Sequence, residues 1–313
     1  MIRRHLSQPV PDALRGAVVA LGNFDGFHSG HQAVVGRAVQ RGFHERRPVI
    51  VATFDPHPVR LFRPDAAPFR LTTLDQRQTL FAGAGADAML VFDFTPDLAA
   101  TSAEDFVERL LLGHVGAAGI VTGDDFTFGK GRGGTVERLA VFSAEQGVVA
   151  EAVHAVLASD ERVSSGRVRD ALIAGDPATA TRLLTRPFAI LGIVERGDQR
   201  GRSLGYPTAN VRLGDYQRPK YGIYAVTARL PDGRTLPGVA SLGIRPTFEP
   251  PIELLETYIF DFDEDLYGQE IEIALHHYLR PESKFDTLDA LVAQMRVDEA
   301  QARALLAAGQ SLA

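Results

Sequence analysis

One stretch decides the fold of the N-terminal half of this chain: Leu21-Gly22-Asn23-Phe24-Asp25-Gly26-Phe27-His28-Ser29-Gly30-His31. The apolar run at 17–21 indicates a short buried strand, and the apolar residues after the stretch recur at helical spacing until Gly42. We therefore predict a strand-to-helix turn, with a helix that ends at Gly42. Its glycines let the backbone approach a ligand closely, and the free N–H groups at a helix start attract an anion. The stretch thus predicts a phosphate site.

Two histidines in this turn are candidates for chemistry. His28 and His31 are close enough in sequence for both imidazoles to face one phosphate and stabilise the charge that builds on it during transfer. A zinc site is the first alternative, but the chain has no cysteine and no third ligand is obvious nearby. Partly exposed loop histidines, which are common, are the second alternative.

Length and composition restrict the class of protein. The 313 residues suggest two domains, at about 150 residues each. Hydrophobic residues make up 45% and charged residues 23%, as in globular proteins, and the net charge of −6 argues against a general nucleic-acid binder. The absence of cysteine suits the cytosol, and we see neither a signal peptide nor an apolar run of about 20 residues that could span a membrane. We expect a cytoplasmic protein.

The first half of the chain alternates apolar and amphipathic segments. Apolar runs at 49–54, 88–92, 119–122 and 148–150 alternate with helical patterns at 74–82, 103–112 and 135–146. Such alternation predicts a Rossmann-like parallel sheet with helices on both faces. The carboxyl ends of its strands lie at one edge, where ligands bind.

Two further segments fall at that edge. Prolines stiffen 53–58, so Asp55 and His57 are presented from a fixed loop, although the loop could also be only a rigid connector. The glycines of 129–134 fit the G-x-G-x-x-G pattern with Glu151 downstream, which would indicate a dinucleotide site. However, residues 124–128 separate the strand from the first glycine, and a flexible hairpin tip explains the glycines as well.

A second candidate anion site lies at 163–169. Serine hydroxyls there can cap a helix that runs toward Ala174, and Arg167 and Arg169 add positive charge. Helix capping alone is the alternative.

The second half has a different pattern. Alternating segments at 189–194, 222–230, 238–242, 256–262 and 270–279 are separated by turns, with a hairpin signal at 231–233. They predict an antiparallel β-barrel, with a domain boundary near 185. Apolar residues between Leu288 and Leu306 predict a terminal helix, capped by Asp286 or Thr287, that packs on the barrel.

The stretch 197–210 is rich in glycine and can wrap phosphates. If it is extended, Thr208 and Asn210 share a face and offer a hydroxyl and an amide oxygen to Mg²⁺. Hydrogen bonds that stabilise the loop are the more frequent use of such residues.

Taken together, these segments resemble the bifunctional riboflavin kinase/FAD synthetase family of prokaryotes. Residues 22–31 resemble the G-x-F-D-G-x-H-x-G-H signature of its nucleotidyltransferase half, and 197–210 resemble the G-D-x-R-G-R-x-L-G-x-P-T-A-N signature of riboflavin kinases. The resemblance extends through 221–226, 241–248, 256–262, 265–268 and 285–286, and so covers almost the full chain.

The resemblance implies two activities on two domains. Residues 1–185 would be an FMN adenylyltransferase of nucleotidyltransferase fold, and 186–313 a riboflavin kinase barrel. Together they would convert riboflavin to FMN and FMN to FAD, with release of pyrophosphate. ATP would be the co-substrate and Mg²⁺ the cofactor. The partners would be small molecules, with no nucleic acid or membrane, and the chain a monomer or weak homo-oligomer.

The resemblance also implies roles for individual residues. Contacts to ATP in the adenylyltransferase would come from Gly22, Phe24, Asp25, Gly30, Ser165, Arg167 and Arg169, with His28 and His31 catalytic. The flavin would contact Phe54, Asp55, His57, Phe62, Asp125 and Phe128. The kinase would bind ATP through Gly197, Arg202, Gly205, Pro207, Thr208 and Asn210, with Mg²⁺ at Thr208 and Asn210. Glu256 would accept the proton of the ribityl 5′-hydroxyl as it attacks the γ-phosphate.

The sequence departs from the family pattern at one position. Gly166 stands where the family's I-S-S-T-x-I-R motif has threonine, which removes a hydroxyl donor from the expected ATP site. One alternative is therefore a flavin-binding protein without turnover. Another is a nucleotidyltransferase for a different phosphate ester, which would have no reason to carry a kinase-like second half.

Overall fold

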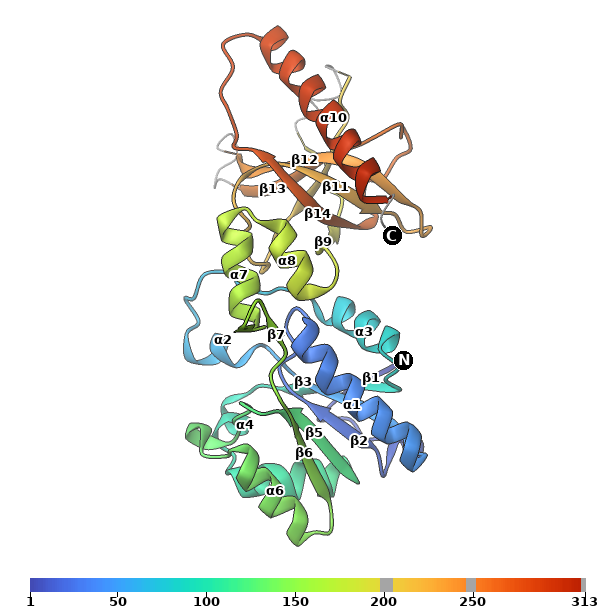
Figure 1. The fold of residues 1–313 in the computed structure, drawn as a ribbon, viewed down its shortest axis with the longest axis vertical. Helices are drawn as coiled ribbons and strands as arrows, with labels where there is room; N and C mark the ends of the chain where they lie inside the picture. The colour runs from blue at the N-terminus through green and yellow to red at the C-terminus, as the bar shows by residue number, and fades with distance from the viewer. Residues whose placement is uncertain (198–204, 246–251, 311–313) are drawn as a thin grey trace. The chain divides into compact units, whose positions relative to one another are not determined.

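The computed structural model describes residues 1–197, 205–245 and 252–310, which form two compact units (Figure 1). The first unit comprises Met1–Ala67 and Leu74–Ser164, and the second Pro68–Thr73 and Ser165–Ala313. The units divide before position 185 because α7 (Ser165–Ala174) and α8 (Pro177–Leu184) pack on each other, and α8 packs on the strands of the second unit.

A parallel sheet forms the centre of the first unit. Its strands are β1 (Ile2–His5), β2 (Val18–Leu21), β3 (Val49–Asp55), β4 (Ala88–Asp93), β5 (Gly119–Gly123) and β6 (Val149–Val153). Among the described residues the order is β1-β4-β3-β2-β5-β6, and every pair is parallel. The predicted sheet is confirmed. The sequence did not reveal β1, because three of the residues 2–5 are basic or histidine and the strand pairs at an edge of the sheet.

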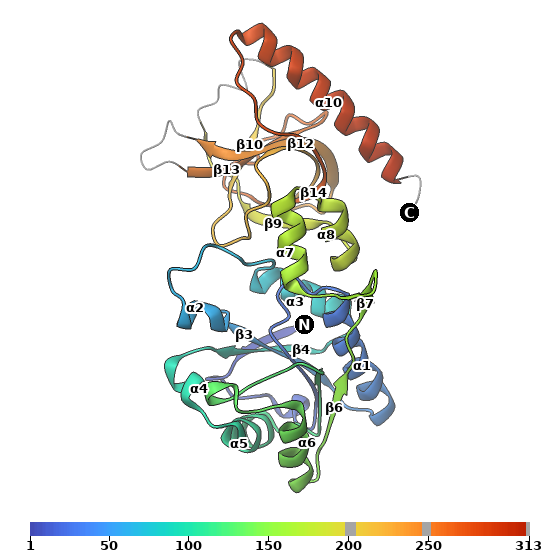
Figure 2. The ribbon, with the colours of Figure 1, turned by 60° about the vertical axis from the view of Figure 1, so that its left-hand side comes forward.

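Helices cover both faces of this sheet (Figure 2). Val18 and Ala20 of β2 join a buried cluster with α1 (Ser29–Glu45) and α3 (Leu74–Gly83), whereas Val19 joins another with η2 (Phe106–His114) and α6 (Val136–Glu145). Alternate residues of β2 thus face opposite layers, which explains its unbroken apolar run. The shorter elements are η1 (Asp12–Leu14), α2 (Pro58–Phe62), α4 (Pro96–Ala100), α5 (Ala103–Asp105), η3 (Lys130–Arg132), β7 (Leu157–Ala158) and β8 (Glu161–Arg162).

The predicted end of the first helix was wrong. α1 continues through Gly42 to Glu45 and ends at Arg46, whose left-handed φ of 55° lets its N–H reach the carbonyls of the last turn. A Cβ on Gly42 would lie 2.4 Å from the Val49 side chain. Gly42 therefore lets α1 pack closely on β3 rather than ending the helix.

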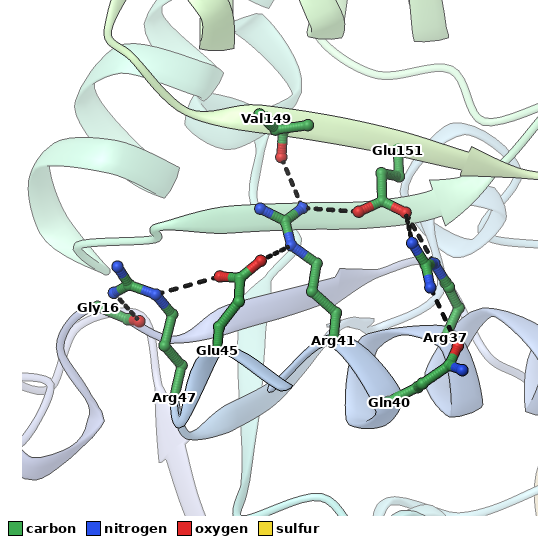
Figure 3. A network of polar contacts seen from close by, with 8 residues as sticks. All are labelled: Gly16, Arg37, Gln40, Arg41, Glu45, Arg47, Val149 and Glu151. Carbon is green, nitrogen blue, oxygen red and sulfur yellow. Dashed lines mark hydrogen bonds and ion pairs between the residues drawn. The ribbon is translucent and has the colours of Figure 1, made fainter. Parts of the chain in front are cut away.

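Ion pairs tie the C-terminal half of α1 to β6 (Figure 3). Arg41 donates to Glu151 and to the carbonyl of Val149, both at 3.0 Å, and Arg37 lies 2.7 Å from Glu151. A Cβ on Gly119 would lie 2.6 Å from the Arg41 guanidinium carbon, so this glycine leaves the room that Arg41 needs.

The second unit is an antiparallel barrel. Its strands are β9 (Phe188–Ile193), β10 (Ala209–Arg212), β11 (Gly222–Arg229), β12 (Thr235–Arg245), β13 (Ile252–Ile259) and β14 (Glu270–Arg280). In the described part the order is β10-β13-β12-β11-β14-β9, and all pairs are antiparallel. An antiparallel bridge between Glu195 and Asn210 joins the two ends of this order, so the sheet is nearly closed. The predicted barrel and its 231–233 hairpin are confirmed.

The terminal helix α10 (Leu288–Gln310) packs on the outside of the barrel (Figures 1 and 2). Ala302 and Leu306 are buried against Ala225 of β11 and Phe260. Thr287 caps the helix, since its Oγ1 accepts from the N–H of Ala290 at 3.1 Å. Packing on the barrel is thus confirmed, although Leu288 at the start of the predicted stripe is exposed.

Candidate active sites

A left-handed turn leads from β2 into α1. Phe24, Gly26 and Phe27 have φ values of 50°, 85° and 45°. His28 then caps α1, because its Nδ1 accepts from the N–H of His31 at 3.3 Å. Non-glycine residues seldom adopt positive φ, and such backbone is concentrated at functional sites. The predicted strand-to-helix turn is therefore present, with a strained backbone.

The two histidines of this turn stack on each other. The ring centroids of His28 and His31 are 3.6 Å apart with an interplanar angle of 17°. Phe24 meets His31 edge-on at 5.3 Å and is itself buried against Phe81. The pair is therefore held from the core side by aromatic packing.

The other predicted residues of the turn surround this pair. Asp25 is buried, and a Cβ on Gly30 would lie 3.2 Å from the His28 ring. A Cβ on Gly22 would lie 3.0 Å from the Phe24 ring. These two glycines therefore leave the room that the aromatic rings occupy.

An arginine that sequence reasoning missed joins this turn to the loop after β3. Arg77 of α3 donates to the Asn23 carbonyl at 3.3 Å, to Thr53 Oγ1 at 2.9 Å and to Asp55 Oδ1 at 3.2 Å. Thr53 itself donates to the Asn23 carbonyl at 2.8 Å. An arginine inside an amphipathic helix pattern gives no signal that it is buried.

The 53–58 loop continues into α2. His57 caps this helix, because its Nδ1 accepts from the Val59 N–H at 3.2 Å. Phe62 is 68% exposed and meets Phe94 at 6.1 Å. Phe54, in contrast, is buried in the core.

The glycine-rich segment after β5 is a turn closed on itself. Phe128 and Gly134 form an antiparallel bridge, and α6 begins only after it, at Val136. Phe128 is buried in the core. Since the carboxylate of Glu151 pairs with arginines of α1, the arrangement does not fit a dinucleotide site.

Arg162 holds the acidic end of this segment. It lies 2.7 Å from Asp124 and 2.8 Å from Asp125, which is exposed. The Ala155 N–H and the Arg162 guanidinium lower the pKa of Asp124, although desolvation opposes them. Sequence reasoning identified Asp125 but missed the arginine that pairs with it.

The predicted second anion site belongs to the second unit. Ser165 and Arg167 are half-buried in the first turn of α7, and Gly166 is exposed. Arg169 donates to the Phe69 carbonyl at 2.8 Å and covers the Phe69 ring at 5.3 Å. One of the hydrogen-bond donors of Arg169 is therefore used within this unit.

Two of the predicted kinase residues, Asn210 and Glu256, lie on one face of the barrel. Asn210 of β10 stands opposite Glu256 of β13, which in turn stands opposite Ser241 of β12. Directly opposed residues point to the same face of a sheet, with Cβ atoms about 4.5–5.5 Å apart. The amide and the carboxylate are thus neighbours. Ser241, which sequence reasoning missed, donates to Glu282 at 3.0 Å.

The segment before β10 approaches Asn210. A Cβ on Gly197 would lie 2.2 Å from Asn210 Nδ2. Thr208 is half-buried, while Gly205, with a φ of 83°, and Pro207 are exposed. The predicted contact Arg202 lies outside the described residues.

The buried oxygen of Asn210 fits a cation ligand. Its Oδ1 is buried and has no hydrogen-bond partner among the residues that the structure describes. In that same part of the chain, no group of three or more His, Cys, Asp or Glu side chains could hold a metal. Mg²⁺ sites in enzymes that use ATP commonly have few protein ligands and rely on water and substrate phosphates, so an amide oxygen such as Asn210 Oδ1 suits one ligand position.

Two family models match this chain, one in each half. The family model described as FAD synthetase matches residues 10–167, and the one described as riboflavin kinase matches residues 184–306. A bifunctional riboflavin kinase/FMN adenylyltransferase of Pseudomonas fluorescens is 41% identical over 294 residues, 94% of each chain. Its counterpart in Escherichia coli K12 is 40% identical over 288 residues, 92% of each chain.

A solved structure shares the fold over the whole chain. It is titled a macrolide-efflux protein from Streptococcus pneumoniae, is 29% identical with a TM-score of 0.86, and the match covers 97% of this chain and 99% of that one. In the described part of this chain, none of the helices has the length and apolar character needed to cross a membrane.

Proposed function

This chain belongs to the bifunctional riboflavin kinase/FMN adenylyltransferase family, which makes FMN from riboflavin and FAD from FMN, and we propose that each activity uses one of the two residue sets described above. We assign adenylyl transfer to residues 1–185 and riboflavin phosphorylation to residues 186–313. The observation that carries the proposal is the stacked His28–His31 pair at the start of α1, inside the segment that matches FAD synthetase.

In adenylyl transfer, a phosphate oxygen of FMN attacks the α-phosphate of ATP and pyrophosphate leaves. His28 and His31 stabilise the charge that develops on the phosphates, aided by the positive end of α1. Because His28 Nδ1 accepts the His31 N–H, the neutral His28 ring carries its proton on Nε2, and this nitrogen donates to a phosphate oxygen. Gly22, Phe24, Asp25 and Gly30 shape the ATP-binding turn around the pair.

The flavin of FMN binds beside this turn. Phe62 offers it an exposed aromatic face, and Asp55 and His57 offer polar groups from the adjacent loop. Asp125, held by Arg162, contributes from the neighbouring strand end. Phe54 and Phe128 support this region from the core.

Ser165, Arg167 and Arg169 bind the ATP phosphates from α7. The half-buried Ser165 and the positive charges suit an anion. Gly166 supplies no hydroxyl, so we expect weaker ATP binding than in relatives that carry threonine there.

In the kinase, Glu256 accepts the proton of the ribityl 5′-hydroxyl as this oxygen attacks the γ-phosphate of ATP. Its neighbour Asn210 lies directly across the strand pair, and this proximity supports a shared role of the two side chains in one site. Gly197, Gly205 and Pro207 provide backbone for the ATP phosphates, together with Arg202, for which the basis remains the sequence alone.

Thr208 and Asn210 would hold the divalent cation, which we propose is Mg²⁺. Bound there, it would neutralise charge on the transferring phosphates. The buried, unpartnered Oδ1 of Asn210 in the described residues supports this assignment. The substrates are small molecules. The monomeric or weakly associated state and the cytoplasmic location stay predictions.

The experiment is to incubate the protein with riboflavin and ATP–Mg²⁺ and to separate the flavins by chromatography over time. We expect FMN followed by FAD. Glu256→Ala should stop FMN formation and spare FAD formation from supplied FMN, whereas His28→Ala with His31→Ala should let FMN accumulate. Undiminished FAD synthesis by the double variant would reject the histidine assignment, and tight flavin binding without turnover would favour a binding protein.

A further inference from the structure

We propose that Arg77 is a positioning residue for adenylyl transfer, which fixes the ATP-binding turn and the flavin-binding loop relative to each other. This inference rests on the proposed function of those two segments. Arg77 touches neither set of reacting atoms in the proposal. It acts through Asn23 on one segment and through Asp55 on the other.

The guanidinium group of Arg77 is surrounded by acceptors from both segments. Nη1 donates to the Asn23 carbonyl at 3.3 Å, to Thr53 Oγ1 at 2.9 Å and to the Phe54 carbonyl at 3.5 Å. Nη2 donates to Asp55 Oδ1 at 3.2 Å. Two nitrogens of one rigid plane thus fix two successive strand ends, those of β2 and β3.

Burial makes this arrangement sensitive to substitution. The Arg77 side chain is 5% exposed and that of Asp55 is 23% exposed, so water competes little for these hydrogen bonds. Thr53, which is fully buried, donates to the same Asn23 carbonyl that Arg77 contacts. Lysine could approach one of these acceptors but cannot present the planar fork that reaches both segments.

The two segments that Arg77 joins carry the residues assigned to ATP and to the flavin in the proposed function. Asn23 lies inside the turn that carries His28, and its buried Oδ1 has no hydrogen-bond partner within the described part of the chain. Asp55 precedes the loop that leads to His57 and Phe62. Because the nucleophile comes with FMN and the electrophile with ATP, a shift between the two segments separates the reacting atoms.

The test is steady-state kinetics of FAD formation from supplied FMN with Arg77→Met, Arg77→Lys and the matched control Arg41→Met. Arg41 is another buried arginine of the same unit, with ion pairs to Glu45 and Glu151. A misplacement of 1 Å can cost about 100-fold in rate, so we expect kcat/KM for FMN to fall about 10- to 100-fold in Arg77→Met. The KM for FMN should rise, and Arg77→Lys should lose less.

Several readouts separate positioning from a structural role. Arg41→Met should lower the thermal midpoint but leave the KM values for FMN and ATP unchanged, and all three variants should retain riboflavin kinase activity. If Arg77→Met fails to fold, the KM values of Arg77→Lys are compared with those of wild type instead. KM values within twofold of wild type in a folded Arg77 variant would overturn the inference. The His28/His31 double variant, measured in the same assay, distinguishes the two proposals. If it is inactive while a folded Arg77 variant keeps wild-type KM values, the positioning role of Arg77 is refuted and the histidine assignment stands.

Discussion

Gly22→Ala tests whether packing behind the histidine pair controls adenylyl transfer. A Cβ at this position would lie 3.0, 3.1 and 3.3 Å from three carbons of the Phe24 ring, where ordinary contacts are 3.4–4 Å. Phe24 cannot retreat freely, since its ring is buried against Phe81 and meets His31 edge-on. We therefore expect the ring to shift by about half an ångström and to displace His31.

The magnitudes follow from this displacement. Overpacking a core costs about 1–3 kcal/mol, and each kcal/mol lowers the midpoint of a unit of this size by about 2–4 °C. The first unit should therefore unfold about 4–8 °C earlier for a cost near 2 kcal/mol. A misplacement of 1 Å can lower a rate about 100-fold, so a displacement of about half an ångström should lower kcat for FAD formation about tenfold.

A double-mutant cycle with Phe24→Leu isolates the clash. Calorimetry and FAD formation from supplied FMN are measured for wild type, Gly22→Ala, Phe24→Leu and the pair. Because leucine lacks the obstructing ring atoms, we expect a favourable coupling of about 0.5–3 kcal/mol and partial recovery of kcat. Strict additivity would refute the reasoning. A raised KM for ATP that persists in the pair would show instead that the new methyl group obstructs the nucleotide directly.

Three more substitutions test other parts of the structure. Glu256→Gln should lower kcat for FMN formation about 10²- to 10⁴-fold, as expected on loss of a general base, without affecting FAD formation from supplied FMN. His28→Asn should keep the cap on the His31 N–H and hence the thermal midpoint, while FAD formation falls; His28→Ala should lose about 1 kcal/mol of stability as well. Glu253→Gln should destabilise the second unit at pH 7 by about 1 kcal/mol. The Arg218 guanidinium holds the pKa of Glu253 below its usual 4.5 in the folded state, so this contribution is lost as the pH falls through the folded pKa. The difference between variant and wild type in urea unfolding should therefore shrink at pH 3.

The fold followed from periodicity wherever segments are buried on a regular face. β2, β3, β4 and β5 read as unbroken apolar runs because neighbours pack on both sides of the sheet. The pattern failed where burial is partial or a residue has a use that the chain does not display locally. Gly42 looked like a helix stop, although its missing side chain serves contact with Val49. Residues 2–5 looked like a polar terminus, although they pair with β4.

The candidate sites were predictable to the extent that backbone geometry needs particular residues. The glycines of the turn follow from turn chemistry, and His28, Asn210 and Glu256 stand out through their chemistry or the family signatures. The cap that His28 forms and the pairing of Asn210 with Glu256 came only from the structure. Arg77 and Arg162 could not be predicted, because each contacts segments that are distant in the sequence. The residues next to an arginine in the chain do not reveal which carbonyl or carboxylate its side chain will contact.

The two ends of α1 are held by different interactions. At the first turn, the His28 ring accepts the His31 N–H, so the helix cap and the ring orientation are one interaction. In its last turns, Arg41 joins the helix to β6 through Glu151 (Figure 3). Because the cap sets the orientation of the His28 ring locally, loss of the Arg41 ion pairs should cost stability of the first unit without changing adenylyl transfer. Loss of the Arg77 contacts, which join the turn itself to the loop after β3, should change the kinetics.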